Sequence, residues 1–431
     1  MKAAPLLLAL LLSACAAGGG GVAAPEPGGV SGPPSLASSP EIAEAPYVVL
    51  VSIDGFRHDY LDRQALPAFR RLEAAGVRAE SLVPVFPTKT FTNHYSIVTG
   101  MYTENHGIVA NDIYDPGFDA LFRIGDTLAV RDARWYDGEP IWVTAERQGV
   151  AAGTFFWPGS EAPILGTLPT YTRRYDGSIP DAARVDSVLA WLSLPAERRP
   201  HLLALYFSLV DDAGHRHGPD SPETARAVRA ADGVLGRLLD GIRELPIAER
   251  VSVVVVSDHG MADVSVGKTY VLEDHVELEG VRSVNSGPFM QLFFAGDSAR
   301  EDRALAALRG LPDARVFRRA EIPEALHLRK SARAGDVLIV MDAPHQIIRV
   351  RRQGSRPSPG VHGYPPANAD MHGIFLAAGP EIRAGVRVPP FENVHIHPFV
   401  ARLLGIRPAP GIDGRMDVLE GVLEGERATL P

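Results

Sequence analysis

Residues 47–55 read YVVLVSIDG, a run of β-branched and other apolar residues that ends in an aspartate and a glycine. The run does not alternate with polar residues, which is the pattern of a strand buried on both faces of a sheet. Three later segments share the pattern, and we expect them to be central parallel strands as well: Leu202–Leu209, Val251–Ser257 and Ile374–Ala378.

Stretches with helical spacing separate these apolar runs: Ala65–Ala75, Ala182–Leu194, Ser221–Leu245 and His395–Leu404. Alternation of strands and helices predicts an α/β fold with a doubly wound, mostly parallel sheet flanked by helices. Residues 261–360 depart from this alternation of strands and helices and contain hairpin-like pieces. We expect them to form a small inserted α+β lobe. Those pieces are Met290–Ala295, Val337–Met341 and Ile347–Val350.

The composition is that of a globular protein. The chain has 431 residues, of which 45% are hydrophobic and 22% charged, so a mostly disordered chain is excluded. Its formal charge of −9 argues against a surface that binds a nucleic-acid backbone, because such a surface is dense in basic residues. A single cysteine excludes a disulfide framework and a thiolate zinc site.

The N-terminus predicts export. Lys2 precedes the apolar run Leu6–Leu12, and the run is too short to span a bilayer but typical of a secretory signal. The ending Leu-Ser-Ala-Cys resembles the bacterial lipobox, which implies a lipoprotein signal peptide over residues 1–14 and a lipid anchor at Cys15. The alternative is an ordinary signal peptide that contains a cysteine. By the same resemblance, Ala16 favours the outer membrane, with the protein facing the periplasm or the cell exterior.

Residues 15–45 are rich in Gly, Pro and Ala, a composition that cannot bury a core. We expect this segment to be a flexible tether and the folded part to begin near residue 46. Membrane association is then expected only through the lipid.

Three of the predicted strands are followed by acidic residues, two of them with a histidine nearby. Asp54 follows the first strand, Asp211 and His215 follow the second, and Asp258-His259 follow the third. Carboxyl ends of parallel strands meet at one edge of a sheet, where ligands bind. Each acid alone is as well explained as a loop residue or a helix cap. Together they favour a divalent metal, and zinc suits such Asp and His ligands.

Other segments add chemistry to this edge. Residues 87–96, PTKTFTNHYS, place Thr90 at the start of a predicted helix. Thr90 is either an N-cap or a nucleophile activated by a metal. Residues 360–364 carry His362 between glycines, and Asn111 offers an amide side chain.

Seven strings in this order resemble the nucleotide pyrophosphatase/phosphodiesterase family of the alkaline phosphatase superfamily. They are VSIDGFR (51–57), PTKTFTNHYSIVTGMYTENHGI (87–108), FWPGSEA (156–162), RYDGSIP (174–180), DDAGHRHGP (211–219), SDHGM (257–261) and VHGY (361–364). The resemblance runs from Tyr47 to about Gly414 and is greatest to the short bacterial members. It implies an alkaline-phosphatase-like catalytic domain over residues 46–425.

The resemblance also implies two zinc ions and a covalent mechanism. One ion would be held by Asp211, His215 and His362. The other would be held by Asp54, Thr90, Asp258 and His259. Thr90 would be the nucleophile and form a phosphothreonine. Asn111 would donate to a non-bridging phosphoryl oxygen.

A nucleotide pocket is implied by the same resemblance. Phe91 and Tyr175 match positions that sandwich a base, and Tyr206 matches a further pocket wall, although core packing explains Tyr206 equally well. Lys89 and Trp157 match pocket positions too. Glu161 stands where the family is expected to have aspartate.

Several residues near these motifs compete for the same roles. We expect His94 to make a structural hydrogen bond, and His217 to be a solvated loop residue. His372 is the rival of His362, and the HGY context favours His362. Asp212 is the rival of Asp211, and the Asp-x-x-Gly-His spacing selects Asp211. His395 and His397 are expected at the surface or in the core.

The sequence therefore predicts an enzyme that cleaves phosphodiester and pyrophosphate bonds of nucleotides and releases nucleoside 5′-monophosphates. Two alternatives use the same site: a phosphomonoesterase with a threonine nucleophile, and a phosphodiesterase acting on choline-containing lysophospholipids. A non-catalytic binding lipoprotein is a third alternative, which the intact set of candidate ligands disfavours.

Overall fold

The computed structural model describes residues 45–350 and 358–424. The predicted signal peptide, the anchor at Cys15 and all but the last residue of the predicted tether lie outside the described residues. Within the described part, no helix combines the length and the apolar character needed to cross a bilayer.

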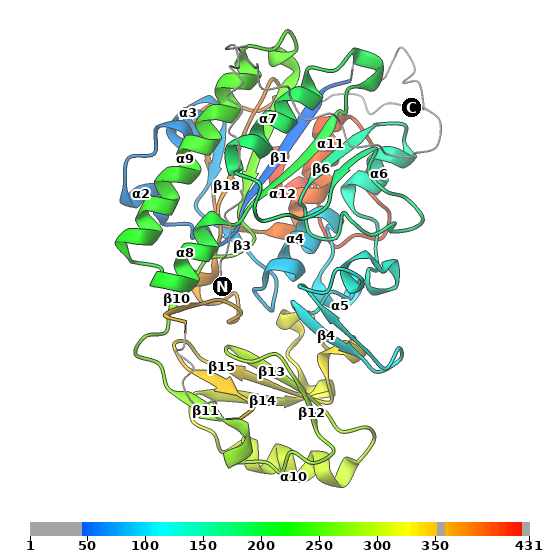
Figure 1. Cartoon of the computed structure of the whole chain (residues 1–431), viewed down its shortest axis with the longest axis vertical. Helices are drawn as coiled ribbons and strands as arrows, with labels where there is room; N and C mark the ends of the chain where they lie inside the picture. Colours follow the sequence, from blue (N-terminus) through cyan, green and yellow to red (C-terminus); the bar gives the residue numbers. More distant parts are fainter. Residues whose placement is uncertain (1–44, 351–357, 425–431) are drawn as a thin grey trace, which may run out of the picture. The chain divides into compact units, whose positions relative to one another are not determined.

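An eight-stranded sheet forms the centre of the described chain (Figure 1). Every neighbouring pair in it is parallel except the two pairs made by β18, which confirms the predicted mostly parallel α/β class. From one edge to the other the strands are β19 (Val386–Val388), β2 (Val77–Ala79), β18 (Phe375–Ala378), β9 (Val251–Val256), β1 (Tyr47–Ile53), β8 (Leu202–Phe207), β6 (Ala152–Phe155) and β7 (Tyr171–Arg173).

The direction of β18 differs from the prediction. We expected Ile374–Ala378 to be a parallel strand, but β18 pairs antiparallel with both β9 and β2. The chain leaves the sheet after β9 through the inserted lobe and returns at His362, beside the carboxyl end of β9, and only the short helix Ala369–Met371 lies between His362 and β18. It must therefore enter β18 from that same edge. A strand buried on both faces has the same apolar pattern in either direction, so the pattern predicted the strand and not its direction.

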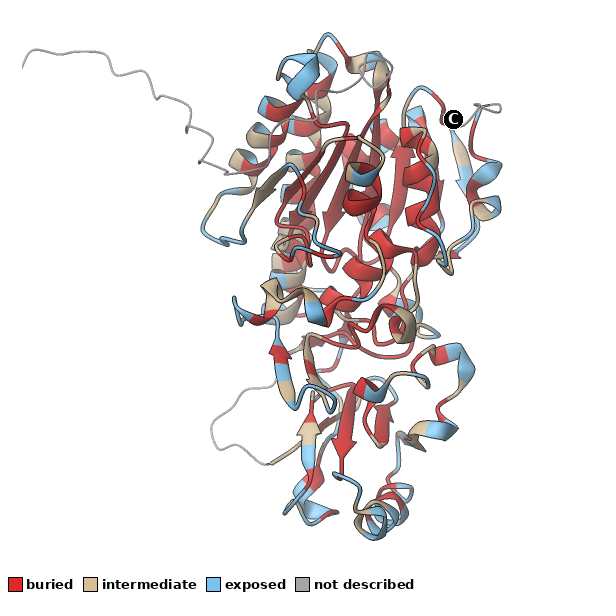
Figure 2. Ribbon diagram, turned by 90° about the vertical axis from the view of Figure 1, so that its right-hand side faces the viewer, coloured by how far each residue is buried: buried red, intermediate tan, exposed pale blue. Residues whose placement is uncertain are grey.

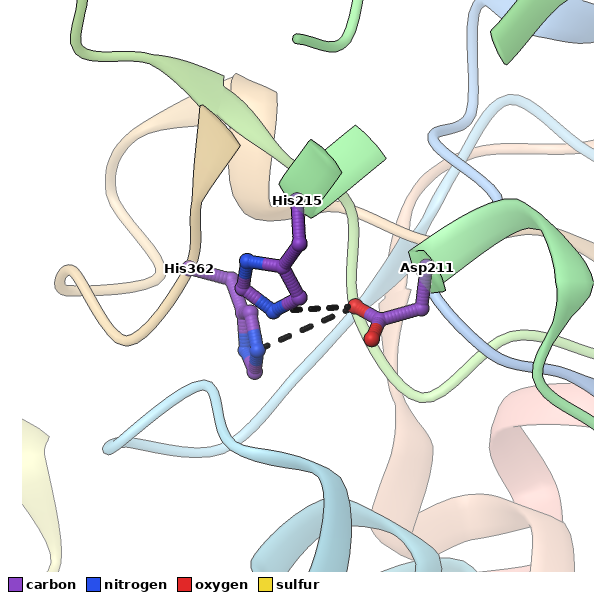
Figure 3. A group of neighbouring side chains, drawn as sticks. All are labelled: Asp211, His215 and His362. Atoms are coloured by element: carbon purple, nitrogen blue, oxygen red, sulfur yellow. Dashed lines mark ion pairs between the residues drawn. The ribbon is translucent and has the colours of Figure 1, made fainter. Parts of the chain in front are cut away.

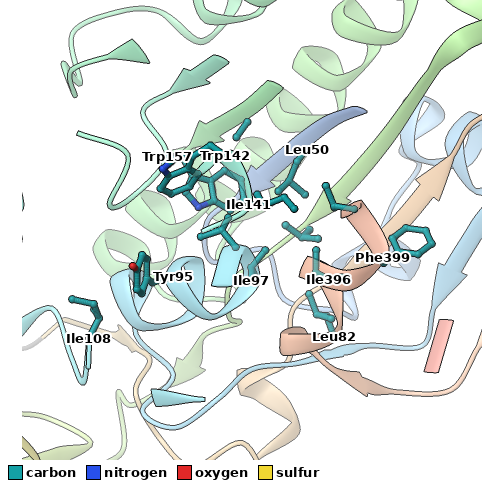
Figure 4. Packing of buried hydrophobic residues seen from close by; sticks show 14 of the residues in the cluster. Leu50, Leu82, Tyr95, Ile97, Ile108, Ile141, Trp142, Trp157, Ile396 and Phe399 are labelled. Carbon is teal, nitrogen blue, oxygen red and sulfur yellow. The ribbon is translucent and has the colours of Figure 1, made fainter. Parts of the chain in front are cut away.

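Helices cover both faces of the sheet (Figures 1 and 2). Val48 and Leu50 of β1 belong to the core shared with α4, α6 and α11, and Figure 4 shows part of this core. Val49 and Val51 belong to the core shared with α3, α7 and α9. The six helices are α4 (Thr90–Thr99), α6 (Ile141–Arg147), α11 (Ile396–Leu404), α3 (Pro67–Ala75), α7 (Asp181–Leu192) and α9 (Pro222–Arg243).

An inserted lobe lies between β10 (Ala262–Asp263) and β17 (Gly360–Val361), which pair with each other where the chain leaves and returns. The lobe has its own antiparallel sheet in the order β12-β13-β15-β14, together with the helix α10. These elements are β12 (Arg282–Val284), β13 (Phe289–Phe293), β14 (Ala314–Arg318), β15 (Val337–Met341) and α10 (Ser298–Leu308). One face of this sheet carries a core of its own, whereas Phe289, Leu338 and Val340 belong to the main core.

One of the expected hairpin pieces in the lobe is not a hairpin. Residues 347–350 were expected to form one, but β16 (Gln346–Ile348) pairs in parallel with β11 (Thr269–Val271). Its partner lies 77 residues earlier, at Thr269↔Gln346, which a local turn pattern cannot reveal.

Candidate active site

The predicted acidic residues meet at the carboxyl edge of the sheet. Asp54 follows β1 and Asp258 follows β9, while Asp211 lies on α8 (Leu209–His217). The predicted strand Leu202–Leu209 ends earlier than expected, at Phe207, and Leu209 already begins α8. Asp211 and His215 are therefore one helical turn apart on one face of α8, which explains how this short segment supplies two neighbouring groups.

Gly55 makes room for this arrangement. Its φ of +68° is disfavoured for residues with a side chain, and a Cβ on it would lie 2.8 Å from Cα of Asp211. The backbone N–H of Asp211 also donates to the carbonyl oxygen of Asp54 over 3.1 Å. The Asp-Gly pair after an apolar strand was the sequence signal for this close approach.

Asp211, His215 and His362 form the first group (Figure 3). Their side chains point toward one another from α8 and from the loop after β17. Nε2 of His215 lies 3.5 Å, and Nε2 of His362 3.8 Å, from Oδ1 of Asp211. The three donor atoms are close enough together to bind one ion.

Asp54, Asp258 and His259 form the second group, which is buried. Nε2 of His259 lies 3.0 Å from Oδ2 of Asp258, 3.4 Å from Oδ1 of Asp54 and 3.4 Å from Oγ1 of Thr90. The rings of His259 and His362 stack with their centroids 3.6 Å apart, so the two groups are adjacent.

The three histidines are oriented in the same way. Each has Nδ1 within 2.8 Å of a backbone carbonyl oxygen: Gly360 for His215, Gly260 for His259 and Thr88 for His362. A carbonyl can only accept, so Nδ1 carries the proton and the neutral ring has a lone pair at Nε2. This orientation is typical of histidines that bind a metal through Nε2.

The carboxylates facing these lone pairs lack hydrogen-bond donors. Within the described residues, no hydrogen bond reaches Oδ1 of Asp54, Oδ1 of Asp211 or Oδ2 of Asp258. Buried carboxylate oxygens against imidazole lone pairs repel one another unless a cation lies between them. The donor set therefore fits two divalent metal ions, and its Asp and His composition suits zinc.

The ionisation of these acids reflects the crowding. Burial raises the pKa of Asp54 well above its usual range, and the charges of Asp258 and Asp211 raise it further. Burial also raises the pKa of Asp211. Burial acts in the same direction on Asp258, but His259 and His94 hold the pKa of Asp258 far below its usual range.

Thr90 is the first residue of α4, and Lys89 occupies the N-cap position. The N-cap position therefore belongs to Lys89, and the alternative that Thr90 is an N-cap does not hold. Oγ1 of Thr90 faces Nε2 of His259 instead. Oγ1 is thus placed beside the second group at a helix N-terminus, where backbone N–H groups favour an anion.

His94 makes structural hydrogen bonds, as predicted. Its Nδ1 lies 2.8 Å from the carbonyl oxygen of Thr90, and its Nε2 lies 2.7 Å from Oγ of Ser52. Oδ2 of Asp258 lies 3.3 Å from the same Nδ1, without a hydrogen bond between them. His94 therefore links α4, which carries Thr90, to β1, beside Asp258.

Asn111 and Lys89 lie beside Thr90. Oδ1 of Asn111 accepts the backbone N–H of Phe91 over 2.9 Å, which fixes the amide and leaves its nitrogen as a donor. Nζ of Lys89 donates to the carbonyl oxygen of His362 over 2.7 Å. Desolvation lowers the pKa of Lys89 to about 8.

The candidate pocket aromatics differ in exposure. Tyr175 is 55% exposed and its ring contacts Phe156, while Phe91 is 7% exposed and packs on Phe122. Glu161, which stands where the family is expected to have aspartate, accepts the backbone N–H of Tyr175 over 2.8 Å and so holds the Tyr175 loop.

Trp157 lies in the core behind α4 and not at an open pocket. It is 1% exposed, and its Nε1 donates to the carbonyl oxygen of His94 over 3.2 Å. In this structure its contacts support the helix that carries Thr90.

The competing histidines and Asp212 lie outside both groups. His217 is exposed at the end of α8 and Asp212 is exposed on the same helix. His372 interacts with Oγ of Ser81 and the carbonyl oxygen of Pro366. His395 and His397 are buried, as one of the two expected placements has it.

Tyr206 plays a part that the sequence did not predict. Its hydroxyl donates to Oδ2 of Asp54 over 2.6 Å, which leaves Oδ1 of Asp54 facing His259. The ring is buried beside His94, and its centroid lies 6.5 Å from that of Tyr175. Tyr206 therefore orients a candidate ligand from behind.

Tyr206→Phe is expected to weaken binding of the second metal ion about 10- to 100-fold, the usual effect of removing a hydrogen bond to a metal ligand. Competition with a zinc chelator at fixed pH measures the change. Tyr171→Phe is the matched control, because its hydroxyl donates to a backbone carbonyl at Arg198, away from both groups. Equal zinc affinity in the Tyr206→Phe and unchanged proteins would show that this hydrogen bond does not orient a ligand.

Comparison with known proteins adds a family match. A family model described as type I phosphodiesterase/nucleotide pyrophosphatase matches residues 48–365. Ectonucleotide pyrophosphatase/phosphodiesterase family member 1 of Homo sapiens is 35% identical over 378 residues, which is 85% of this chain and 41% of that protein. Venom phosphodiesterase CdcPDE of Crotalus durissus collilineatus is 35% identical over 386 residues, 88% of this chain and 46% of that protein. The chain thus spans less than half the length of these curated relatives.

Solved structures of similar proteins cover the same region. An inactive variant of murine ectonucleotide pyrophosphatase/phosphodiesterase 5 in complex with AMP superposes with a TM-score of 0.83 at 31% identity. The match covers 88% of this chain and 100% of that one. The human protein of the same name gives the same TM-score and identity.

Proposed function

Because this chain belongs to the type I phosphodiesterase/nucleotide pyrophosphatase family, we propose that it hydrolyses phosphodiester and pyrophosphate bonds of nucleotides and releases nucleoside 5′-monophosphates. The catalytic domain is residues 46–425. The observation that carries the proposal is the hydroxyl of Thr90 beside two adjacent groups of carboxylates and imidazoles.

Two zinc ions complete the proposed site. Asp211, His215 and His362 would hold one ion. Asp54, Asp258, His259 and Thr90 would hold the other. Bound zinc ions would supply positive charge to stabilise the deprotonated oxygen of Thr90 and the phosphoryl oxygens.

The residues of the chain then perform a two-step transfer. Oγ1 of Thr90 gives its proton to solvent and attacks phosphorus, an Oγ1–P bond forms, and the bond from phosphorus to the leaving oxygen breaks, with the leaving oxygen taking up a proton from solvent. Water hydrolyses the resulting phosphothreonine and restores the hydroxyl. The amide nitrogen of Asn111 and the backbone N–H of Thr90 donate to phosphoryl oxygens during both steps.

The proposed nucleotide pocket lies on the side of Tyr175. Phe91 and Tyr175 stack on the base, and stacking tolerates any base because every base has an aromatic face. Lys89 and Tyr206 would complete the pocket, Lys89 from its place at the start of α4 and Tyr206 from its place behind Asp54. Trp157 would act on the pocket only through α4, which it supports.

Three aryl esters test the function. We expect the p-nitrophenyl ester of thymidine 5′-monophosphate to react faster than bis-p-nitrophenyl phosphate, because only the former offers a nucleoside to the pocket. We expect it to react faster than p-nitrophenyl phosphate too. Metal analysis of the same protein should give about two zinc ions per chain. If p-nitrophenyl phosphate is hydrolysed faster than the nucleotide ester, the protein is a phosphomonoesterase. Turnover of glycerophosphocholine in place of the nucleotide ester would show the choline-specific alternative.

We further propose export and a lipid anchor at Cys15, in the outer membrane. The relatives named above carry names of extracellular and venom enzymes. Cys15→Ser in the full chain is expected to move the protein from the membrane fraction to the soluble fraction. A protein that stays in the membrane fraction after this substitution would contradict the anchor.

A further inference from the structure

The segment that carries Asn111 is held in place by the inserted lobe. Side chains from two parts of the lobe reach the backbone on either side of Asn111. Asn285, which follows β12, donates through Nδ2 to the carbonyl oxygen of Asp112 over 2.9 Å. Arg333 donates through Nη1 to the carbonyl oxygen of Gly107 over 2.8 Å. The lobe therefore contacts the chain one residue after Asn111 and four residues before it.

The Asn285 side chain is fixed by a second hydrogen bond, which lies inside the lobe. Its Nδ2 also donates to Oε1 of Gln291 over 2.7 Å. Gln291 is fully buried on β13, and its own amide nitrogen donates to the carbonyl oxygen of Arg333 over 3.2 Å. A chain of hydrogen bonds thus joins the two lobe residues that hold the Asn111 segment, and a satisfied network of this kind makes their positions rigid.

The backbone of Asn285 has an unfavourable conformation. Its φ of +65° lies in the left-handed region, which glycine adopts freely and which asparagine tolerates better than most residues with a side chain. What asparagine adds over glycine at this position is the amide group and its two hydrogen bonds. Strained backbone of this kind is concentrated at functional sites, where a side chain must be held in one place.

Asn285 acts one residue away from a group that faces phosphorus in the proposed mechanism. Oδ1 of Asn111 accepts the backbone N–H of Phe91, which directly follows Thr90, and no hydrogen bond within the described residues uses Nδ2 of Asn111. The backbone carbonyl oxygen of Asn111 accepts the N–H of Ile124 over 3.0 Å. The hydrogen bond from Asn285 holds the next carbonyl along the chain. Two consecutive carbonyls are therefore anchored, and they fix the amide of Asn111 relative to Thr90.

We propose that Asn285 is a positioning residue for phosphoryl transfer: through the carbonyl oxygen of Asp112, it keeps the amide nitrogen of Asn111 where it donates to a phosphoryl oxygen. This inference rests on the proposed function and adds to it a role for the inserted lobe, which supplies none of the candidate metal ligands. A donor aimed at charge that develops in the transition state loses much of its effect when it shifts by about 1 Å. The lobe thus contributes to kcat without contacting the reacting atoms.

Asn285→Gly in the full chain with zinc tests this role. Glycine suits the backbone conformation and removes only the amide, so the fold should be preserved. With the p-nitrophenyl ester of thymidine 5′-monophosphate, kcat is expected to fall about tenfold with little change in KM, because Asn111 acts on charge that develops in the transition state. Asn111→Ala removes the donor itself and is expected to lower kcat about 100-fold.

The double variant separates positioning from a general effect on the fold. If Asn285 acts through Asn111, Asn285→Gly has no further effect once the Asn111 amide is gone, and the double variant loses about 100-fold in kcat. Independent effects multiply, so a loss of about 1000-fold in the double variant would overturn the proposal. An unchanged kcat in the Asn285→Gly single variant would overturn it as well.

Asp313→Gly is the matched control. Asp313 is another lobe residue with a positive φ, +60°, and its side chain accepts the hydroxyl of Tyr270 over 2.8 Å inside the lobe. The substitution removes a side-chain hydrogen bond at the same kind of backbone position and should leave kcat unchanged. An equal fall in kcat with Asp313→Gly would mean that any loosening of the lobe slows the reaction, and the specific role of Asn285 would be wrong.

Failure of the proposed function is read separately. If the unchanged protein does not hydrolyse the nucleotide ester, the nucleotide phosphodiesterase assignment is wrong. The unchanged protein, the two single variants at Asn285 and Asn111 and the double variant are then titrated calorimetrically with orthovanadate, an oxyanion that resembles the five-coordinate phosphorus of phosphoryl transfer. Weaker binding in both single variants, with no further loss in the double variant, would support the positioning role. Binding to the Asn285→Gly protein that equals binding to the unchanged protein would overturn it.

Discussion

Thr90→Ala is expected to reduce turnover of nucleotide diesters by at least about 10³-fold, the order of loss seen when a covalent nucleophile is removed. The reason is geometric: Oγ1 of Thr90 is the hydroxyl placed 3.4 Å from Nε2 of His259 at the start of α4. The variant should still bind both metal ions, because carboxylates and imidazoles remain in each group. Steady-state rates and zinc content of the same preparation measure the two effects.

Thr92→Val is the matched control for this substitution. Thr92 lies two residues further along α4, is fully buried, and its hydroxyl has no hydrogen-bond partner among the described residues. Its replacement removes a threonine hydroxyl from the same helix without touching either group. Activity retained in Thr90→Ala would show that the nucleophile is assigned to the wrong residue, and equal losses in both variants would show a defect of the helix.

The central strands, and the acidic residues that follow them, could be predicted from the sequence. A run such as Tyr47–Ile53 is almost entirely apolar and is followed directly by Asp54. The family membership predicted from the seven strings is confirmed by the family match. The direction of β18 could not be predicted, since residues on a strand buried on both faces meet the same surroundings whichever way the strand runs. The early start of α8 was missed because the apolar run continues through Leu209 and Val210.

The sequence predicted the candidate site residues that directly follow a strand. It did not predict contacts between side chains that are far apart in the sequence. Asp54, Asp258 and His259 follow strands, so topology alone brings them to one edge. The hydrogen bond from Tyr206 to Asp54 joins residues 152 positions apart, and no local pattern separates this tyrosine from a core residue. The burial of Trp157 behind α4 has the same cause, because its position in a motif does not show which way the indole points.

His215→Ala should remove about one of the two zinc ions per chain and lower kcat at least about 100-fold. Substitution of a residue that only orients a metal ligand lowers activity about 10- to 100-fold, and loss of a ligand itself should lower it at least as much. The expectation follows from the first group, in which His215 supplies one of three donor atoms and is oriented by the carbonyl oxygen of Gly360 over 2.8 Å. Added zinc should restore part of the activity, because Asp211 and His362 remain.

His217→Ala separates ligation from the general effect of losing a histidine on α8. His217 is two residues from His215 and exposed, whereas Asp211 lies one turn before His215 on the same face. The control should keep both ions and its activity. If the two alanine variants lose zinc equally, the site does not depend on the face of α8 that carries Asp211. If His215→Ala keeps two ions and its activity, His215 is not a metal ligand and its assignment to the first group is wrong.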